Sequence, residues 1–520
     1  MTVEGSLAPD QGTGAPATQS PAAPRTTMEA FNPATREGIG HIFATSPHDI
    51  PAFVTRAKEA ARHWGDLAHA QRARVLARLR ALVAQRADEI AATIARGMGK
   101  PLIEALSFEV TIVLQTLDDC IASRRVEPED EPDRAPRDKD LHAPSEAQCA
   151  PRAVVCVLAP VSSPFERAMT PAVLALAQGC AVLIKPSASA PLVGVLIADL
   201  FQEALREFPS VAQVVHGDAE FGTCLATAQG IDVVVFSGAR AAARTLQAAL
   251  KPLSRPTRFT VRSAVVLIVC DDANLERVAN ATVFGRFSNN GQGSATVGWV
   301  YVQRSLADAF VHKVVHKVRA LKSGPYTDPH CELGPLANGR GLEHLRALLQ
   351  DALDQRATLV TGGFPPHVTG LDHGERRSAQ QQGFFWPPTV VTEAGRSTRL
   401  MREEVFGPIL PICVVEDDRE AILFTNEAPA GSAACVFSSD IARAQRIAAE
   451  LKVDQVAIND LIPKNTLPGR PGADKRVLID DGRSDRDAAW FPYSAAKLNA
   501  LARDPTQQHA PANGLESIDA

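Results

Sequence analysis

The sequence contains few aromatic residues and no excess of positive charge. Phenylalanine, tryptophan and tyrosine make up 5% of the 520 residues, and 54 lysines and arginines stand against 59 aspartates and glutamates, for a formal net charge of −5. Base-stacking surfaces need clusters of aromatic side chains, and binding to a nucleic-acid backbone needs a basic surface. The composition therefore predicts a protein without a nucleic-acid partner.

Clusters of metal-binding or disulfide-forming residues are also lacking. The 9 cysteines form no CxxC pair and no group with histidines; they stand singly at positions 120, 149, 156, 180, 224, 270, 331, 413 and 435. Structural zinc sites and disulfide frameworks require such groups, so we expect neither a metal site nor disulfides. Thiols such as Cys156, which lies in an apolar run, are predicted to be buried and reduced.

Long apolar runs and targeting signals are missing as well. No apolar stretch reaches the roughly 18 residues that a membrane span needs. Residues 1–28 are rich in Ala, Pro, Thr, Ser and Gly but lack the basic and apolar blocks of a secretory signal. We therefore predict a disordered tail over 1–28, no membrane association and a cytoplasmic protein.

What the sequence does contain is an alternation of strand and helix patterns. Its length favours more than one domain, and its 45% apolar and 22% charged residues are typical of globular proteins. Helical spacing from 50 to 124 is followed by a charged, proline-rich stretch over 124–148. Short runs of Val, Ile and Leu then alternate with helical stretches, which is typical of parallel strands in a doubly wound α/β sheet. The predicted strands are 153–158, 181–184, 211–215, 233–236, 265–269, 299–302, 358–360, 409–415 and 434–437.

Several short motifs, each weak alone, are specific when taken together in their order. They are Met98-Gly99-Lys100-Pro101 with Glu104, Ala159-Pro160 with Pro164-Phe165, Lys185-Pro186-Ser187, Val215-His216-Gly217-Asp218, Phe236-Ser237-Gly238, Asn289-Asn290-Gly291-Gln292 and Glu403-Glu404-Val405-Phe406-Gly407-Pro408. Through these motifs, residues 28–461 resemble the aldehyde dehydrogenase superfamily.

The resemblance implies an aldehyde-dehydrogenase-like α/β fold with two doubly wound α/β domains and a small oligomerisation arm. We expect a Rossmann-like NAD(P)-binding domain over 29–270, with an arm segment at 124–150, and a catalytic-type domain over 271–460. Residues 461–503 are expected to return to the cofactor domain or the oligomerisation region, and 504–520 to form a tail. The expected assembly is a homo-oligomer, or a hetero-oligomer with a related protein.

The resemblance also implies a reaction, in which a cysteine thiolate attacks an aldehyde, hydride passes to a nicotinamide and a glutamate activates water. The cysteine position, which follows Gly291-Gln292, is Ser294 in this chain. Thr260 stands at the glutamate position, and Ser162 stands where the family has the asparagine that stabilises the oxyanion. A serine hydroxyl ionises near the value of water, roughly 15.7, so Ser294 would attack only with a base in contact.

Two interpretations of Ser294 stay open. It is either a small polar residue in the place of a cysteine, or a new nucleophile for acyl transfer or hydrolysis. The second interpretation needs a His, Asp or Lys partner, which spacing does not reveal. The sequence Gly293-Ser294-Ala295 lacks the GxSxG turn of hydrolases, which favours the first interpretation.

The predicted cofactor site keeps part of the family pattern. Lys185 stands where the family's lysine bonds the adenosine ribose, and Ser237-Gly238 precede a helix whose backbone amides can approach a pyrophosphate. Glu404 and Phe406 match the residues that hold the nicotinamide ribose and ring. The alternatives are a solvated Lys185 and purely structural roles for Glu404 and Phe406.

The predicted cofactor site also departs from the family pattern, and these departures together determine the function that we predict. Ala188 replaces a ribose-binding glutamate, so we expect NAD or NADP to bind weakly or not at all. Together with Ser294, Thr260 and Ser162, this predicts a catalytically impaired relative, a pseudoenzyme, with residual nucleotide binding and an accessory or structural role. The alternatives are an active NAD(P)-dependent aldehyde oxidoreductase with compensating residues, and a repurposed acyl-transfer enzyme that uses Ser294.

Overall fold

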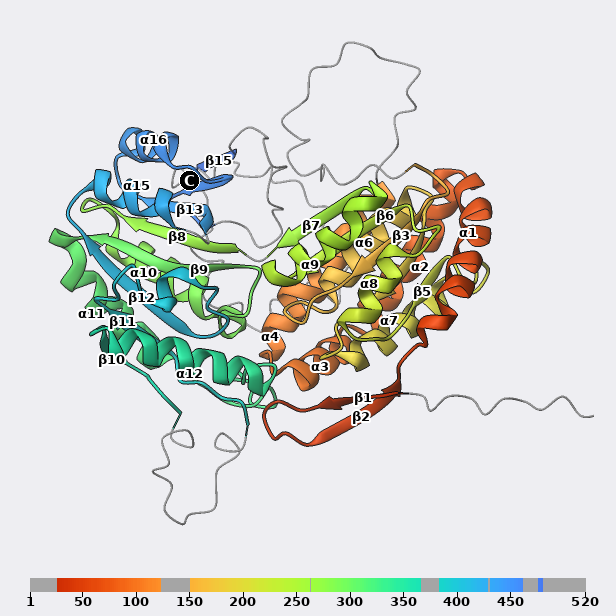
Figure 1. The fold of residues 1–520 in the computed structure, drawn as a ribbon, viewed down its shortest axis with the longest axis horizontal. Coiled ribbons are helices and arrows are strands. Elements are labelled where there is room, and N and C mark those ends of the chain that lie inside the picture. Colours follow the sequence, from red (N-terminus) through yellow and green to blue (C-terminus); the bar gives the residue numbers. More distant parts are fainter. Residues whose placement is uncertain are drawn as a thin grey trace, which may run out of the picture.

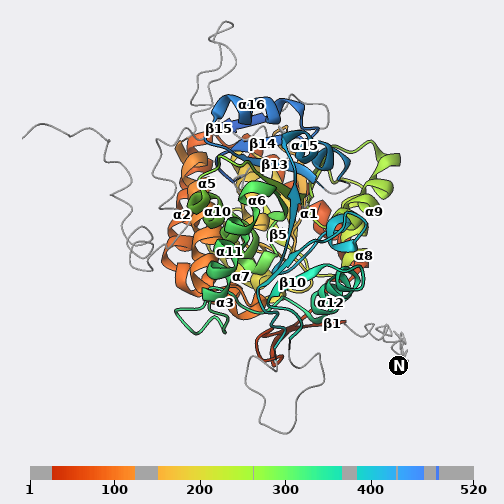
Figure 2. The same cartoon turned by 90° about the vertical axis from the view of Figure 1, so that its left-hand side faces the viewer.

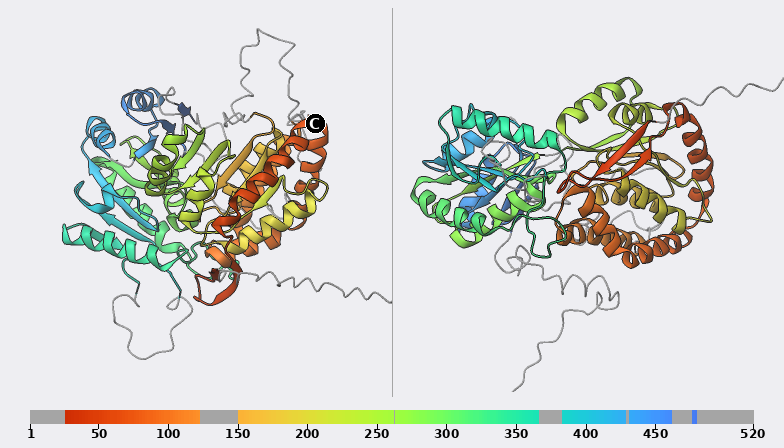
Figure 3. Two further views of the ribbon diagram at one scale, coloured as in Figure 1. Left: turned by 45° about the vertical axis from the view of Figure 1, so that its right-hand side comes forward. Right: turned by 90° about the horizontal axis from the view of Figure 1, so that it is seen from below.

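The chain folds into two lobes, each built on a mainly parallel β-sheet (Figure 1). The computed structural model describes residues 26–122, 150–261, 263–365, 383–428, 431–461 and 476–479. Most of the predicted tail over 1–28, the arm segment at 124–150 except its last residue, and the tail at 504–520 lie outside the described residues. Figure 3, in its view from below, shows the two lobes side by side.

The first lobe begins with the helices that the spacing over 50–124 predicts. Helix α1 buries Val54, Ala57, Ala61 and Trp64, whose three- and four-residue spacing places them on one face. Helix α3 ends at Gly99, which adopts the left-handed conformation (φ 75°) that favours glycine after a helix. The helices are α1 (Ile50–Asp66), α2 (His69–Gln85), α3 (Ala87–Met98), α4 (Leu102–Ala105), a π-helical turn (Leu106–Val110) and α5 (Thr111–Ala122).

The sheet of the first lobe has five parallel strands in the order β5-β4-β3-β6-β7. Alternate residues of β3 face opposite sides: Val155 and Val157 pack in one hydrophobic cluster with α2, α6 and α7, and Cys156 packs in another with α1, α8 and α9. The elements are β3 (Val154–Leu158), α6 (Glu166–Ala177), β4 (Ala181–Lys185), α7 (Pro191–Ala204), β5 (Ala212–Val214), α8 (Ala219–Thr227), β6 (Val233–Gly238), α9 (Arg240–Leu250) and β7 (Thr257–Val261).

The sheet of the second lobe has eight strands in the order β10-β11-β12-β9-β8-β13-β14-β15, and only the β10–β11 pair is antiparallel. Helices α10 and α11 cover one face, and α12 and α16 pack on the other. Figure 2 shows α15 and α16 beside β13 to β15 at the top of the molecule. The strands are β8 (Ser263–Val269), β9 (Ala295–Gln303), β10 (Thr358–Thr361), β11 (Thr389–Thr392), β12 (Ile409–Val415), β13 (Gly431–Phe437), β14 (Gln455–Ile458) and β15 (Arg476–Ile479), and the helices are α10 (Leu275–Phe287), α11 (Arg304–Ala320), α12 (Gly339–Asp354), α14 (Arg399–Arg402), α15 (Asp418–Glu427) and α16 (Ile441–Glu450).

The two sheets confirm the predicted doubly wound α/β fold, but the connections between them differ from expectation. Strand β8 lies ahead of the boundary predicted at 270 and yet belongs to the second sheet, so the chain crosses between the lobes after β7. Strand β15 pairs with β14 and extends the second sheet, although it falls in the segment 461–503 that we expected to return to the cofactor domain or the oligomerisation region. Pairing partners distant in sequence decide both placements, and residue pattern alone does not identify them.

A hairpin of β1 (Thr27–Phe31) and β2 (Gly38–Phe43) lies beneath the first lobe in Figure 1. Its first strand includes Thr27 and Met28, so the tail predicted over 1–28 ends earlier than expected. The hairpin was not predicted because its residues are largely exposed and show no buried face. None of the helices in the described ranges combines the length and the apolar character that crossing a bilayer requires.

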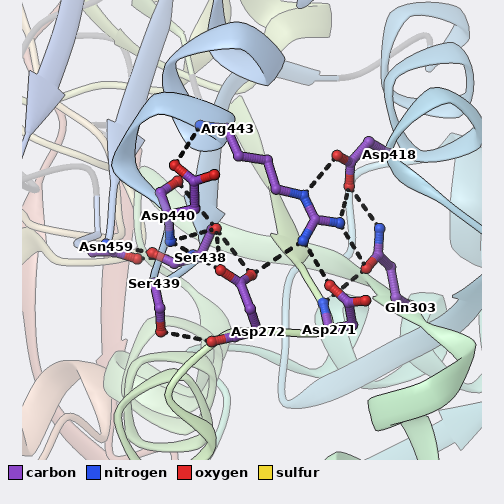
Figure 4. Close-up of polar contacts among 9 residues, drawn as sticks. All are labelled: Asp271, Asp272, Gln303, Asp418, Ser438, Ser439, Asp440, Arg443 and Asn459. Carbon is purple, nitrogen blue, oxygen red and sulfur yellow. Dashed lines mark hydrogen bonds and ion pairs between the residues drawn. The ribbon is translucent and has the colours of Figure 1, made fainter.

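Arg443 of α16 ties together the carboxyl ends of neighbouring strands in the second sheet (Figure 4). Its guanidinium donates to Asp271 after β8 (2.6 Å), to Asp418 at the start of α15 (2.7 Å) and to Gln303 at the end of β9 (3.1 Å). Asp272 accepts a further bond from Arg443 and also bonds Ser438. One cation therefore holds several aspartates that would otherwise repel one another.

Replacing this cation tests its contribution to stability. We expect Arg443→Met to lower the free energy of unfolding by about 2 kcal/mol, because hydrogen-bonded, partly buried carboxylates lose their counter-ion. Arg304→Met removes an exposed arginine that pairs with Glu416 and serves as the matched control; it should cost about 0.5 kcal/mol or less. Urea denaturation measures both values. Equal losses for the two variants would show that Arg443 is not a structural tie.

Candidate functional site

Ser294 follows a turn whose backbone is left-handed over consecutive residues. Asn289 (φ 52°), Asn290 (φ 54°) and Gly291 (φ 68°) lie between α10 and β9. Asparagine and glycine tolerate this conformation better than other residues do. A Cβ at position 291 would lie 2.4 Å from the carbonyl oxygen of Gly407, so only glycine fits there. The Asn-Asn-Gly motif thus brings the segment before Ser294 against the Glu403–Pro408 loop.

Polar groups of the first lobe hold this turn. Glu104 accepts a hydrogen bond from the backbone amide of Asn289 (2.7 Å). The side-chain amide of Asn289 donates to the carbonyl oxygen of Ser162 (2.9 Å), and Lys100 donates to the same oxygen (3.2 Å). The structure therefore brings the segment of Ser162 together with the turn that leads to Ser294.

A buried ion pair fixes the position of Lys100. Its ammonium group lies 2.5 Å from the carboxylate of Glu109, and the two side chains are 2% and 0% exposed. Glu109 sits in the π-helical turn before α5, a distortion that often marks functional positions. The second carboxylate oxygen accepts from the backbone amides of Phe165 (2.8 Å) and Glu166 (3.3 Å) at the start of α6. Sequence reasoning missed Glu109, because nothing in a helical pattern marks a buried carboxylate.

The hydroxyl of Ser294 receives a hydrogen bond from Arg167. The guanidinium Nη2 lies 3.4 Å from Ser294 Oγ, and Nε lies 3.0 Å from the carboxylate of Glu166. Burial raises the pKa of Glu166 above its usual range, while Arg167 opposes the shift. An arginine side chain is not deprotonated in proteins and offers no acceptor. The group that contacts the Ser294 hydroxyl is therefore a donor and not a base. Arg167 was also missed, although two adjacent charged residues in an apolar helix were a visible signal.

Thr260 lies with the predicted cofactor residues. On β7 it is the register partner of Ser237 on β6, and its carbonyl oxygen accepts a bond from the Ser237 hydroxyl (3.4 Å). Thr260 is buried, and no hydrogen bond joins it to Ser294 among the residues that the structure describes. Gly238, at the end of β6, precedes α9, whose N-terminus faces the second lobe through Arg240.

Lys185 is buried at the end of β4 and is not solvated. Its ammonium group donates to the carbonyl oxygens of Gly217 (2.9 Å) and Pro186 (3.0 Å). Burial lowers the pKa of Lys185 to about 8, although Asp218 opposes the shift. His216 lies close by, and burial lowers its pKa to about 4, with a smaller effect from Lys185. The alternative of a solvated Lys185 is therefore wrong.

Glu404 connects the two lobes across the predicted cofactor site. Its carboxylate Oε1 lies 3.6 Å from Nε of Arg240, at the N-terminus of α9, and has no hydrogen-bond partner in the described part of the chain. His344 Nε2 lies 3.3 Å from the carbonyl oxygen of Glu404. Phe406, on the same loop, is half-buried. The ion pair thus joins the helix that follows Ser237 and Gly238 to the loop that carries Glu404 and Phe406.

A buried arginine, Arg286, donates hydrogen bonds to the Glu403–Pro408 loop. Arg286 of α10 donates to the carbonyl oxygens of Val297 (3.0 Å), Val405 (3.3 Å) and Gly407. Burial lowers the pKa of Arg286 to about 9. It lines a cavity with room for little more than one water molecule, together with Trp299, Thr296 and residues 403–405. Arg286 is thus a positioning residue for the loop that carries Glu404 and Phe406.

Most of the described thiols are deeply buried, as the sequence predicts. Burial raises the pKa of Cys156, Cys270 and Cys413 to about 12, and that of Cys331 to about 11. Thiols in such surroundings are inert because the thiolate is the reactive species. Cys224 on α8 is the exception, since it is exposed. Cys149 lies outside the described residues.

Comparison with known proteins places these features in context. A family model described as the aldehyde dehydrogenase family matches residues 20–469. The chain is 30% identical over 506 residues to a 4,4′-diapolycopene aldehyde oxidase from Methylomonas sp, covering 91% of this chain and 89% of that protein. It is 29% identical to aminoaldehyde dehydrogenase 1, peroxisomal, from Pisum sativum, covering 82% and 84%.

Solved structures agree with this similarity. A mutant of aldehyde dehydrogenase C from Pseudomonas syringae, solved with NAD⁺ and octanal, is 25% identical, with a TM-score of 0.74 over 86% of this chain and 87% of that one. Lactaldehyde dehydrogenase from Escherichia coli is 26% identical, with a TM-score of 0.74 over 84% and 88%.

The Lys100–Glu109 pair should contribute strongly to stability. We expect Lys100→Met to lower the free energy of unfolding by about 3–5 kcal/mol, because a buried carboxylate loses its counter-ion. Lys313→Met is the matched control, since Lys313 pairs with Glu276 at the surface; it should cost less than about 1 kcal/mol. Chemical denaturation compares the two. A loss at position 100 no larger than the control would contradict this role.

The lowered pKa of Lys185 predicts a pH dependence. Between about pH 8 and 10.5 the unfolded chain binds the lysine proton and the folded chain does not, so stability should rise with pH in this window. The rise attributable to Lys185 is about 3 kcal/mol, because one pKa unit corresponds to about 1.4 kcal/mol. Urea denaturation of the wild type and Lys185→Met at pH 8 and above isolates it. Parallel pH profiles for the two proteins would refute the lowered pKa.

Proposed function

The chain belongs to the aldehyde dehydrogenase family, and from this premise we propose that it is a catalytically impaired member, a pseudoenzyme with residual nucleotide binding. The observation that carries the proposal is the contact between Ser294 and Arg167. A serine hydroxyl becomes a nucleophile only when a base removes its proton. The guanidinium of Arg167 donates to this hydroxyl and accepts no proton.

In the described part of the chain, no thiol and no proton acceptor is hydrogen-bonded to the Ser294 hydroxyl. Cys270 and Cys331 are buried, with pKa values raised to about 12 and 11, so neither is a thiolate near neutral pH. Thr260, at the position of the family's general base, is buried beside Ser237 and does not accept a proton at neutral pH. Loss of a positioned base alone costs about 10² to 10⁴ in rate.

The residues at the cofactor site fit a dinucleotide but favour weak binding. Glu404 Oε1 is a buried acceptor without a hydrogen-bond partner in the described ranges, which suits a ribose hydroxyl. Lys185, Ser237 and Gly238 would hold the adenosine and pyrophosphate part of NAD or NADP, and Glu404 and Phe406 the nicotinamide part. When bound, the cofactor supplies a hydride acceptor. Binding would compete with the bonds that Lys185 already makes and with the Arg240–Glu404 ion pair.

An active NAD(P)-dependent aldehyde oxidoreductase is the second candidate. It is favoured by the names of the relatives, which include an aldehyde oxidase and aminoaldehyde dehydrogenases. A repurposed acyl transferase that uses Ser294 has less support, because the side chain bonded to the Ser294 hydroxyl is Arg167, which is a donor and not a base. For the impaired protein we propose an accessory or structural role in the cytoplasm, as a homo-oligomer or in a hetero-oligomer with a related protein.

Turnover assays separate the candidates. With a panel of aldehydes and NAD⁺ or NADP⁺, we expect the wild type to form reduced nicotinamide at least about 10⁴-fold more slowly than the roughly 10 s⁻¹ of a median enzyme. Ser294→Cys alone should stay far below that rate, because base and oxyanion donor are also missing. Combining it with Thr260→Glu and Ser162→Asn should raise the rate by at least about 10².

Nucleotide binding is the control for these variants. Calorimetry should give dissociation constants for NAD⁺ and NADP⁺ that differ little between the wild type and Ser294→Cys, because position 294 contributes nothing to the proposed nucleotide contacts. Ordinary turnover by the wild type would overturn the proposal and favour the second candidate. Full activity of Ser294→Cys by itself would show that a base and an oxyanion donor were present throughout.

A further inference from the structure

Helix α11, on the outer side of the second lobe, carries two histidines one turn apart on its exposed face (Figure 1). Its residues Phe310, Val314 and Val318 recur every four positions and are buried against the sheet. His312 and His316 each follow one of these residues by two positions, about 200° around the helix, and both are exposed. The same periodicity that packs one face of α11 therefore presents the histidines to solvent on the other.

The spacing of the two histidines suits a shared ligand. Residues four apart on a helix have Cβ atoms about 5–6 Å apart, so both imidazole rings can reach one ion. The same spacing on a helix lets two histidines bind zinc in metalloproteases. Neither His312 nor His316 makes a hydrogen bond or an ion pair in the described part of the chain, so their ring nitrogens are available.

Neighbouring charges do not repel a cation from this face. Lys313 and Lys317 follow the histidines in sequence, but both ammonium groups bond the carboxylate of Glu276 on α10, at 2.6 Å each. This shared carboxylate draws the two ammonium groups toward α10 and offsets part of their charge. Asp308, which is exposed, lies one turn before His312 on the same face and adds a negative charge.

We propose that His312 and His316 form a binding site for a divalent ion of the late first-row transition metals, such as Ni²⁺, Cu²⁺ or Zn²⁺. Imidazole suits these ions, whereas Mg²⁺ and Ca²⁺ prefer oxygen ligands. The lack of cysteine clusters argues against a structural zinc site, but a histidine pair needs no cysteine. The described residues contain no group of three side-chain ligands, so water completes the coordination and the ion is exchangeable. The site shares no residue with the surroundings of Ser294 and does not depend on the proposed function.

Calorimetric titration of the untagged, full-length chain with NiCl₂ tests the site. We expect His312→Gln and His316→Gln each to weaken Ni²⁺ binding by at least about tenfold, because two linked ligands bind far more tightly than one. His330→Gln removes an exposed histidine elsewhere in the second lobe and should leave the affinity unchanged. Carrying all variants in a Cys224→Ser background removes the exposed thiol as a competing ligand.

Moving the pair along the helix tests whether the spacing matters. Ala320→His, added to His312→Gln, places a histidine four residues after His316 at an exposed position and should restore Ni²⁺ affinity to within about fivefold of the wild type. Ser305→His, added to the same variant, is the matched control. It restores the number of histidines on α11 but stands about 16 Å from His316 along the axis, so the affinity should stay low.

Electron paramagnetic resonance with one equivalent of Cu²⁺ gives a second measurement. The spectrum should show coupling to nitrogens of two imidazoles in the wild type and of fewer in His316→Gln. Equal Ni²⁺ affinity of the wild type and both glutamine variants, or equal affinity of the Ala320→His and Ser305→His double variants, would overturn the histidine site. The turnover assay for the proposed function is independent of every one of these outcomes.

Discussion

The arrangement around Ser294 depends on one buried ion pair, between Lys100 and Glu109. Lys100 bonds the carbonyl oxygen of Ser162, and Glu109 bonds the amides at the start of α6, so one pair orients both segments. Because both charges are inaccessible to water, neither can be lost without leaving the other uncompensated. Glu109 lies in the π-helical turn Leu106–Val110.

The Ser294 hydroxyl is contacted by a hydrogen-bond donor, the guanidinium of Arg167, whereas activation of a serine nucleophile needs a proton acceptor. Arg167 reaches Ser294 because α6 starts where Glu109 holds it, and because the left-handed turn at Asn289–Gly291 advances the second lobe toward it. A guanidinium beside a hydroxyl stabilises an anion and does not create a nucleophile.

At the predicted cofactor site, internal contacts occupy the groups that a nucleotide would bind. The ammonium group of Lys185 donates to backbone carbonyl oxygens, and burial lowers its pKa to about 8. Arg240 and Glu404, both proposed to lie at the nucleotide site, join the lobes through an ion pair. A ligand would have to exchange these internal contacts for its own, so fold retention and affinity for nucleotide are separate properties of this chain.

The sequence by itself determined the fold class and the positions of the main helices and strands, because apolar periodicity and motif order are local properties of the chain. It also placed Ser294, Thr260, Ser162, Lys185 and Glu404 at family positions. Only the tertiary structure decided that β8 and β15 join the second sheet, that Thr260 lies beside Ser237, and that Arg167 contacts Ser294. These are contacts between residues far apart in sequence, and their energies depend on burial and on neighbouring charges that no local pattern encodes.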